Sequence, residues 1–389
     1  MKTHRDPVER GEVQTVRSRY TVEQYEPRHA VAFSRFISLI WPQHDSSDGS
    51  SVPTDAQRKS PTFLFFKNED IIGHVATLPV RFHLRKETIP AHWIVGFMVH
   101  PEHRNGLVGP YLIKKVKETL DMAMSLHVED AVLRIVKQLG WKHIGVVPQY
   151  IQVLRAGELL RNISSVELAS TRRNVWLRVA QKLLSYRPAQ MTMAALIQIA
   201  LAMWWYAKCW ARPRVKEVSV VEEHEFDSSY DMLWQTVGQK FDATVARDKA
   251  YLLHRYGRHF KDHTVLACRK NGNLLGFMIV KVKQFKDDPR MGSLRMGTIV
   301  DCLFDPDDSQ SVQALISASR ERVVSRAAAV MFCTASHHTL RESLRANGFI
   351  RIPGNLNFAI SDRHAIVPHD LPLSSYHLMR GDSDAADNF

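Results

Sequence analysis

The chain repeats one order of expected elements in two stretches, and this recurrence most constrains its fold. In the first stretch, hydrophobic periodicity and turn residues predict strands at 20–25, 62–67, 71–84, 91–100 and 146–154, with helices at 27–41, 106–124 and 129–139. In the second, they predict strands at 217–223, 265–269, 274–283, 298–304, 329–334 and 355–360, with helices at 227–238, 312–326 and 340–346. The repetition predicts an α/β protein with two domains that arose by internal duplication.

Size and charge fit this prediction and restrict the partners. The 389 residues are enough for two domains and a connector. A net charge of +12 favours an anionic partner, which could be a nucleotide cofactor, a nucleic acid or an acidic membrane surface. The polar N-terminus predicts no signal peptide, and the widely spaced cysteines predict neither a disulfide framework nor a zinc ribbon. We therefore expect a cytoplasmic protein, either free or peripheral at the membrane.

Residues 93–116 form the most informative segment. An apolar strand is followed by a basic turn with Arg104, Gly106 and Gly109, and then by a helix. A helix N-terminus offers unpaired N–H groups and a partial positive charge, and glycines allow a ligand to approach the backbone. The segment suits a pyrophosphate, although an ordinary strand–loop–helix with two turn glycines would look the same.

This segment resembles the acyl-CoA-binding motif of the GNAT acetyltransferase superfamily, Arg/Gln-x-x-Gly-x-Gly/Ala. Arg104 takes the first position and Gly109 the last, while Leu107 stands where the family has its middle glycine. The strand order over about 20–155 extends the resemblance. It implies two GNAT-like domains, each with a mixed, mostly antiparallel central sheet flanked by helices, joined by a helical connector.

The order of elements and the composition predict the domain limits, and the resemblance implies the cofactor contacts. We expect a flexible N-terminus at 1–18, a GNAT domain at 19–155, a connector at 156–216, a second GNAT-like domain with a degenerate CoA motif at 217–365, and a tail at 366–389. Acetyl-CoA or another acyl-CoA would be held at Met98 and Val99 along the pantetheine arm, and around the pyrophosphate by the backbone of Arg104, Asn105, Gly106, Leu107, Val108, Gly109 and Pro110.

The catalytic groups are less clearly marked. His100 ends the strand before the turn and can titrate near neutral pH, so it is one candidate base. The family's tyrosine acid falls on Val136, leaving Tyr111 or Tyr150, which also suit packing roles. We expect no metal at His100 and His103, because no third ligand lies nearby in the sequence.

The second stretch carries the other candidate base. Asp301 lies among apolar residues of an expected strand and would be partly desolvated, although a structural pairing with an arginine is the alternative. The segment that follows, 305–311, is acidic and lacks glycine, so it should repel a pyrophosphate.

The connector is strongly basic and contains an apolar segment. Residues 155–216 hold eleven Lys or Arg and two Glu, and residues 189–207 carry no charge. Three arrangements remain open for this segment: a helix buried between the domains, a helix lying on an anionic membrane through residues 187–214, or a membrane-spanning helix. The tail residues 379–384 resemble those of tandem GNAT-like proteins associated with polysaccharide synthesis, or form a disordered acidic end.

These observations favour an acyl-CoA-dependent N-acyltransferase whose acceptor is a small amine, such as an amino sugar or an envelope-polysaccharide precursor. One alternative is an aminoacyl transferase of the peptidoglycan-bridge kind, which would use aminoacyl-tRNA. Another is a non-catalytic CoA-binding scaffold of polysaccharide synthesis. We see no nucleic-acid recognition motif and do not expect nucleic acid as a partner.

Overall fold

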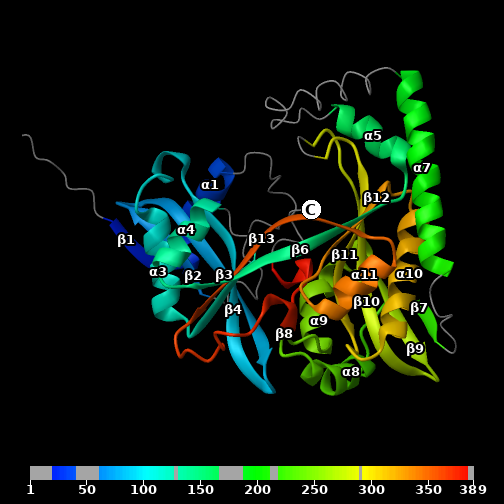
Figure 1. The fold of residues 1–389 in the computed structure, drawn as a ribbon. Coiled ribbons are helices and arrows are strands. Elements are labelled where there is room, and N and C mark those ends of the chain that lie inside the picture. Colours follow the sequence, from blue (N-terminus) through cyan, green and yellow to red (C-terminus); the bar gives the residue numbers. More distant parts are fainter. Residues whose placement is uncertain are drawn as a thin grey trace, which may run out of the picture. The chain divides into compact units, whose positions relative to one another are not determined.

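A computed structural model describes residues 20–40, 61–126, 130–165, 187–210, 218–288 and 291–383 (Figure 1). The flexible N-terminus expected at 1–18 lies outside these residues. The chain divides into two compact units. Unit 1 comprises residues 1–76 and 96–116, and unit 2 comprises residues 77–95 and 117–389.

Unit 1 is built on an antiparallel sheet with a small apolar core. Its elements are β1 (Tyr20–Gln24), η1 (Pro27–His29), α1 (Ala30–Ile40), β2 (Thr62–Lys67), the first part of β3 (Asp70–Leu84), the end of β4 (Glu87–Val99), η3 (Pro101–His103) and most of α3 (Val108–Thr119). Strand β2 pairs antiparallel with both β1 and β3. The core forms because α1 places Phe33, Phe36 and Ile37 against Leu64 and Phe66 of β2.

Strand β3 separates the two helices of unit 1. Successive side chains of a strand point to opposite faces of its sheet. His74 lies against the rings of Phe33 and Phe36 on α1, whereas Gly73 faces Val108 and Leu112 on α3. Helices α1 and α3 therefore cover opposite faces.

Unit 2 contains the remaining elements. They are β5 (Met122–Leu126), α4 (Asp130–Gln138), β6 (Lys142–Val153), α5 (Ala156–Ser165), α7 (Arg187–Trp210), β7 (Ser219–Glu223), α8 (Ser229–Val237), η5 (Gly238–Lys240), β8 (Ala243–Val245), α9 (Lys249–Tyr256), η6 (Gly257–Asp262), β9 (His263–Lys270), β10 (Asn273–Gln284), β11 (Arg295–Phe304), α10 (Ser309–Ser325), β12 (Val330–Thr334), α11 (His338–Ala346), β13 (Ile350–Asp362), η7 (Leu373–Ser375), β14 (Tyr376–His377) and η8 (Arg380–Asp382).

Its strands follow the order β4-β5-β13-β6-β12-β11-β10-β9-β7. Strand β8 pairs with the second part of β3, and β14 pairs with β8. Most pairs are antiparallel, while β4 with β5, β11 with β12 and β8 with β14 are parallel. Strand β13 lies between β5 and β6, and β6 also pairs with β12. The last strand of the first stretch, β6, thus pairs with β12 of the second stretch, and the last strand of the second stretch, β13, pairs with β5 of the first. Figure 1 shows β6 and β13 side by side.

Helices cover both faces of the sheet around β10. Gly276 faces Leu315 of α10, and the next residue, Phe277, contacts the ring of Tyr230 on α8. This alternation matches that of Gly73 and His74 in unit 1. The prediction of a mixed α/β fold with a mostly antiparallel sheet flanked by helices is confirmed.

The helix expected at 106–124 is too long. Helix α3 ends at Thr119, and Met122–Leu126 is a fully buried strand whose partners are β4 and β13. Alanine, methionine and leucine favour helices, and Leu120 and Ala123 continue the helical spacing of α3. Burial in the centre of a sheet overrides that local preference.

The C-terminal segment is part of the core up to Ser383. Arg380, Asp382 and Ser383 are all at most 2% exposed, and Met379 belongs to the main apolar cluster of unit 2. A disordered end is therefore wrong for residues 379–383. Residues 384–389 lie outside the described part of the chain.

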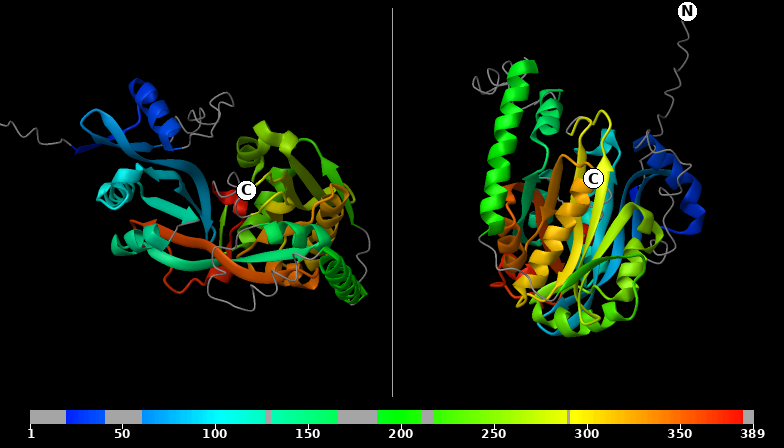
Figure 2. Two further views of the ribbon diagram at one scale, coloured as in Figure 1. Left: turned by 90° about the horizontal axis from the view of Figure 1, so that it is seen from above. Right: turned by 90° about the vertical axis from the view of Figure 1, so that its right-hand side faces the viewer.

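Helix α7 lies along the outer edge of unit 2, next to α5 and α10 (Figures 1 and 2). Met191, Leu196 and Tyr206 are each more than two-thirds exposed, so a helix buried on all sides is wrong. None of the helices in the described ranges combines the length and apolarity needed to cross a bilayer.

Candidate functional site

The end of β4 is fixed by backbone contacts within unit 1. The His100 N–H donates to the Ile72 carbonyl of β3 over 2.8 Å. Three residues before the end of the strand, Gly96 has a φ of +60°, in the left-handed region that residues with a Cβ avoid. Met98 and Val99 follow this irregularity with half-buried side chains, which places them immediately before the turn.

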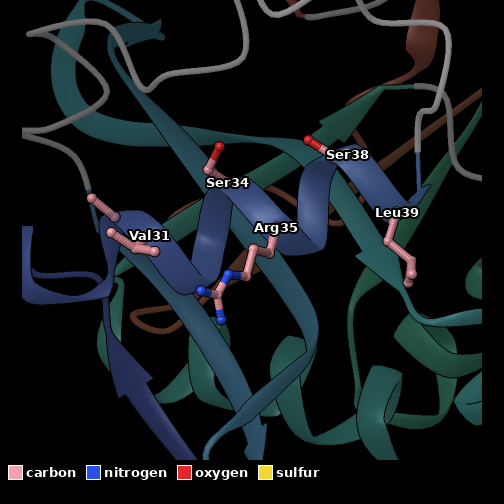
Figure 3. Close-up of a pocket in the computed structure, with 6 residues that line it drawn as sticks. Val31, Ser34, Arg35, Ser38 and Leu39 are labelled. Carbon is pink, nitrogen blue, oxygen red and sulfur yellow. The ribbon is translucent and has the colours of Figure 1, made fainter.

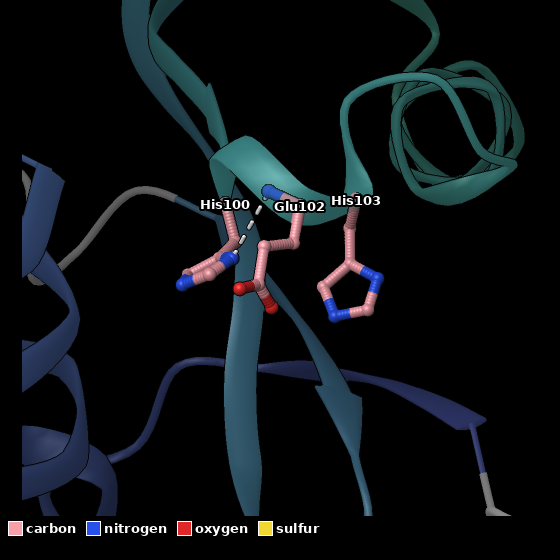
Figure 4. Close-up of side chains that lie close together, drawn as sticks. All are labelled: His100, Glu102 and His103. Atoms are coloured by element: carbon pink, nitrogen blue, oxygen red, sulfur yellow. Dashed lines mark hydrogen bonds between the residues drawn. The ribbon is translucent and has the colours of Figure 1, made fainter.

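The turn contains the polar groups of the site (Figure 4). His100 caps η3, and its Nδ1 accepts from the Glu102 N–H over 3.3 Å. Arg104 is exposed, and its Nε donates to the Val99 carbonyl over 3.3 Å. This bond holds the cation of Arg104 beside the end of β4.

Helix α3 begins directly after this turn. Leu107 is 67% exposed, Asn105 and Gly106 are also exposed, and Val108 and Gly109 are buried. The first N–H groups of a helix have no intrahelical acceptor, and Pro110 has no N–H to satisfy. Leu107 has no side-chain acceptor to cap the helix, and the described residues show no partner for the amides of Val108 and Gly109, so the positive end of the dipole can attract an anion.

Gly73 is a site residue that our sequence analysis missed. A Cβ at this position would lie 2.6 Å from Val108 Cγ1 and 3.3 Å from the Met98 carbonyl oxygen. Only glycine lets the start of α3 approach β3 and β4 this closely. An isolated glycine inside a strand often marks such an approach, so the sequence held a signal for it.

The corresponding helix of the second stretch, α10, is closed to anions. Asp308 caps it by accepting from the N–H groups of Gln310 and Ser311. Asp305 and Asp307 both bind the Lys240 ammonium, at 2.7 and 3.0 Å. A carboxylate therefore occupies the amides of Gln310 and Ser311, whereas Leu107 offers α3 no such cap.

The hydrogen bond of His100 constrains what its ring can do. With Nδ1 accepting from Glu102, the neutral ring carries its proton on Nε2 and presents a donor. To take a proton from a substrate at Nε2, the ring must give up this bond and adopt the other tautomer. His100 therefore has the position of a candidate base, but its resting tautomer is that of a donor.

The structure places a third potential metal ligand, Glu102, close to His100 and His103, which the sequence analysis did not consider. Their candidate ligand atoms all lie within 4.8 Å of one another (Figure 4). Two imidazoles and one carboxylate are a ligand set that can bind a transition metal. All three come from one exposed turn, and the geometry by itself does not require an ion.

The other candidate base, Asp301, lies in a sealed ionic cluster of unit 2. Its Oδ1 accepts from Arg247 Nε at 2.7 Å and its Oδ2 from the Tyr256 hydroxyl at 2.8 Å, and all three side chains are buried. Arg247 also binds both oxygens of Asp382, at 2.8 and 2.9 Å. This is the arginine pairing that the sequence left open as the alternative.

The tyrosines differ in accessibility. Tyr150 is fully buried, and its hydroxyl accepts from Arg341 Nε over 3.2 Å. Tyr111 on α3 is 50% exposed and contacts the ring of Phe65. Val136 is a buried residue of α4. Of the two candidate acids, only Tyr111 is open to solvent.

Buried His74 makes unit 1 sensitive to acid. Burial lowers its pKa from 6.5 to about 3, and its Nδ1 has no hydrogen-bond partner among the described residues. The imidazole of His74 takes up a proton at a higher pH in the unfolded chain than in the folded chain. The free energy of unfolding is therefore at its full value above pH 6.5 and decreases as the pH falls from 6.5 towards 3. We expect His74 to account for about 2 kcal/mol of lost stability between pH 7.5 and pH 5.

Chemical denaturation at both pH values tests this expectation. His74→Gln should reduce the loss on acidification by that amount, whatever its own stability at neutral pH. An unchanged loss in the variant would show that the proton uptake lies elsewhere.

A surface pocket lies on the outer face of α1 (Figure 3). Its lining comprises Ala30, Val31, Ser34, Arg35, Ser38 and Leu39. These residues supply one guanidinium and two hydroxyls. They do not include the turn at 100–107, which remains the candidate site.

Comparison with known proteins relates the fold and this turn to one superfamily. Residues 28–143 match the family model described as an acetyltransferase (GNAT) domain. No curated protein sequence matches the chain.

Solved structures with a similar fold cover most of the chain at low identity. A GCN5-related N-acetyltransferase from Anabaena variabilis is 10% identical, with a TM-score of 0.55 over 88% of this chain and 72% of that one. N-myristoyltransferase from Saccharomyces cerevisiae with bound myristoyl-CoA is 11% identical, with a TM-score of 0.53 over 92% and 89%. A glucosamine N-acetyltransferase region of a fungal multi-domain β-N-acetylglucosaminidase is 10% identical, with a TM-score of 0.50 over 89% and 38%. The fold is that of GNAT-type acyltransferases.

Proposed function

We propose that this chain is an acyl-CoA-dependent N-acyltransferase that binds the cofactor at the turn between β4 and α3. The start of α3 carries the proposal, because Leu107 cannot cap it and the exposed Arg104 lies in the turn that leads into it. The family match covers this segment. Met98 and Val99 would contact the pantetheine arm, and the backbone of residues 104–110 would hold the pyrophosphate.

The reaction follows from the chemistry of a thioester and an amine. The amine nitrogen attacks the thioester carbonyl, the C–S bond breaks, and the thiolate leaves with a proton. We assign proton removal from the amine to His100 and protonation of the thiolate to the exposed Tyr111. We assign Asp301 a structural role, since its cluster leaves neither oxygen exposed.

We propose an amino sugar, free or in an envelope-polysaccharide precursor, as the acceptor. The fungal structural neighbour is a glucosamine N-acetyltransferase region. The tail residues 379–384 resemble those of tandem GNAT-like proteins associated with polysaccharide synthesis. We further propose that residues 19–155 and 217–365 are duplicated GNAT-like domains joined by 156–216, of which only the first binds cofactor.

A thiol-release assay with acetyl-CoA and a panel of amines, glucosamine among them, tests the function. We expect His100→Ala to lower kcat by roughly 100-fold or more, as for loss of a general base, and to change the KM for acetyl-CoA by less than about twofold. Tyr111→Phe should lower kcat by roughly 100-fold, as for loss of a general acid, and should leave the KM for acetyl-CoA within about twofold of wild type.

The same assay distinguishes the second candidate function. A protein that binds acetyl-CoA but releases no thiol with any amine would be a CoA-binding scaffold. The tautomer of His100 and the burial of Asp301 are the observations that favour that alternative.

A further inference from the structure

Three side chains of the turn after β4 face a common point. The candidate ligand atoms of His100, Glu102 and His103 all lie within 4.8 Å of one another. The two imidazole rings have their centroids 5.7 Å apart, and Figure 4 shows the Glu102 carboxylate between them. Glu102 thus supplies the third ligand whose absence led the sequence analysis to expect no metal here.

Only side-chain rotation is needed to bring these atoms onto one ion. Zinc holds nitrogen and oxygen ligands at about 2.0–2.2 Å, so two ligand atoms of a tetrahedral ion are roughly 3.3 Å apart. The separations here are at most 4.8 Å, so each must close by about 1.5 Å or less. The backbone already holds the turn, because the His103 N–H donates to the His100 carbonyl over 2.8 Å.

The existing contacts of these side chains compete little with an ion. His100 Nδ1 accepts from the Glu102 N–H over 3.3 Å, which is long for an N–H donor. The Glu102 carboxylate makes no ion pair with any residue that the structure describes, and Arg104 directs its Nε to the Val99 carbonyl instead. Among the described residues, an ion would therefore displace at most one long hydrogen bond and no ion pair.

The types of ligand select the class of ion. Imidazole nitrogens suit zinc, copper and nickel, whereas magnesium and calcium require oxygen ligands. Two histidines and one carboxylate match a zinc site in which three protein ligands leave the fourth position to water or a substrate. Glu102 is exposed and the histidines are half-buried, so an ion can reach all three from solvent.

We propose that His100, Glu102 and His103 bind a divalent transition-metal ion of the zinc type. Bound zinc would occupy the lone pair with which His100 would take a proton from the amine, and would thus inhibit acyl transfer. This consequence rests on the proposed function, whereas the binding of the ion does not.

Titration of the metal-free, untagged full chain with Zn²⁺ against a chromogenic chelator tests the proposal. We expect the wild type to bind one Zn²⁺ at this site at micromolar concentration. Glu102→Gln with His103→Gln should weaken this site at least roughly 100-fold, because two of its three ligands are lost. Mg²⁺ in roughly thousandfold excess should not displace the zinc.

The matched control is His224→Gln with Glu225→Gln, which removes the same groups from two adjacent exposed residues before α8. It should bind zinc within about twofold of wild type, and circular dichroism checks that both variants fold. Absence of zinc binding by the wild type, equal binding by the turn variant, or displacement by Mg²⁺ would overturn the proposal. The titration contains no acyl-CoA and no amine, so its result is independent of whether the chain is an acyltransferase.

Discussion

Replacing Gly109 with glutamate is expected to remove measurable acetyl-CoA binding, a loss of more than roughly 100-fold. Gly109 is buried in the first turn of α3, where its amide has no intrahelical acceptor. A carboxylate at this point would occupy the space and the positive end of the helix dipole that the pyrophosphate needs. Isothermal titration calorimetry of both proteins measures the difference.

A second substitution separates loss of binding from loss of folding. Leu107 is 67% exposed, so Leu107→Glu should fold, and its charge should stabilise α3 by about 0.3–1 kcal/mol. We expect the same variant to weaken acetyl-CoA roughly tenfold by repulsion, whereas Leu107→Gln should bind within about twofold of wild type. Stronger folding together with undiminished binding would place the pyrophosphate elsewhere.

Replacing Arg247 with methionine is expected to destabilise unit 2 by about 3–5 kcal/mol. Arg247 is fully buried and is the cation that binds both Asp301 and Asp382. Without it, two enclosed carboxylates lose their counter-charge. Asp301→Asn should cost less, because Arg247 would still pair with Asp382. Urea denaturation measures both changes.

The pH dependence of the destabilisation by Arg247→Met shows whether the lost counter-charge causes it. Burial already raises the pKa of Asp382 from 3.8 to about 6 in the wild type. A carboxyl whose folded pKa is raised holds its proton more tightly when folded, so its cost is complete at neutral pH and fades as the pH falls towards 3.8. The difference between Arg247→Met and wild type should therefore shrink on acidification. A pH-independent difference would indicate lost packing instead.

Activity of Asp301→Asn decides the role of that residue. If Asp301 only supports the fold, the rate of acyl transfer should fall no further than the folded fraction of the variant does. A large loss of kcat in a fully folded variant would restore Asp301 as a catalytic candidate.

Sequence periodicity predicted most elements but not the partners of the strands. A repeated order gives no information about neighbours, so the exchange that places β13 between β5 and β6 could not be predicted. Strand β5 was missed because its methionines and alanine continue the helical pattern of α3. The buried positions of Gly381 and Asp382 depend on hydrogen bonds from Arg255 and Arg247, which are far away in the sequence.

The candidate site, too, could be predicted from the sequence only in part. The turn at 100–107 and the start of α3 were predictable, because consecutive residues build a helix N-terminus. Gly73 was not identified, since its role depends on the approach of Val108 from another element. The enclosure of Asp301 likewise arises from Arg247 and Tyr256, and an apolar strand pattern cannot distinguish a sealed carboxylate from an accessible one.

Amide hydrogen exchange with and without acetyl-CoA tests the central claim most directly. If backbone N–H groups of the turn and of α3 hold the pyrophosphate, acetyl-CoA should slow exchange in peptides that cover residues 98–112, and should leave the start of α10 at 309–313 unchanged. Protection at 309–313 instead, or acetyl-CoA binding that leaves 98–112 unprotected, would contradict the account.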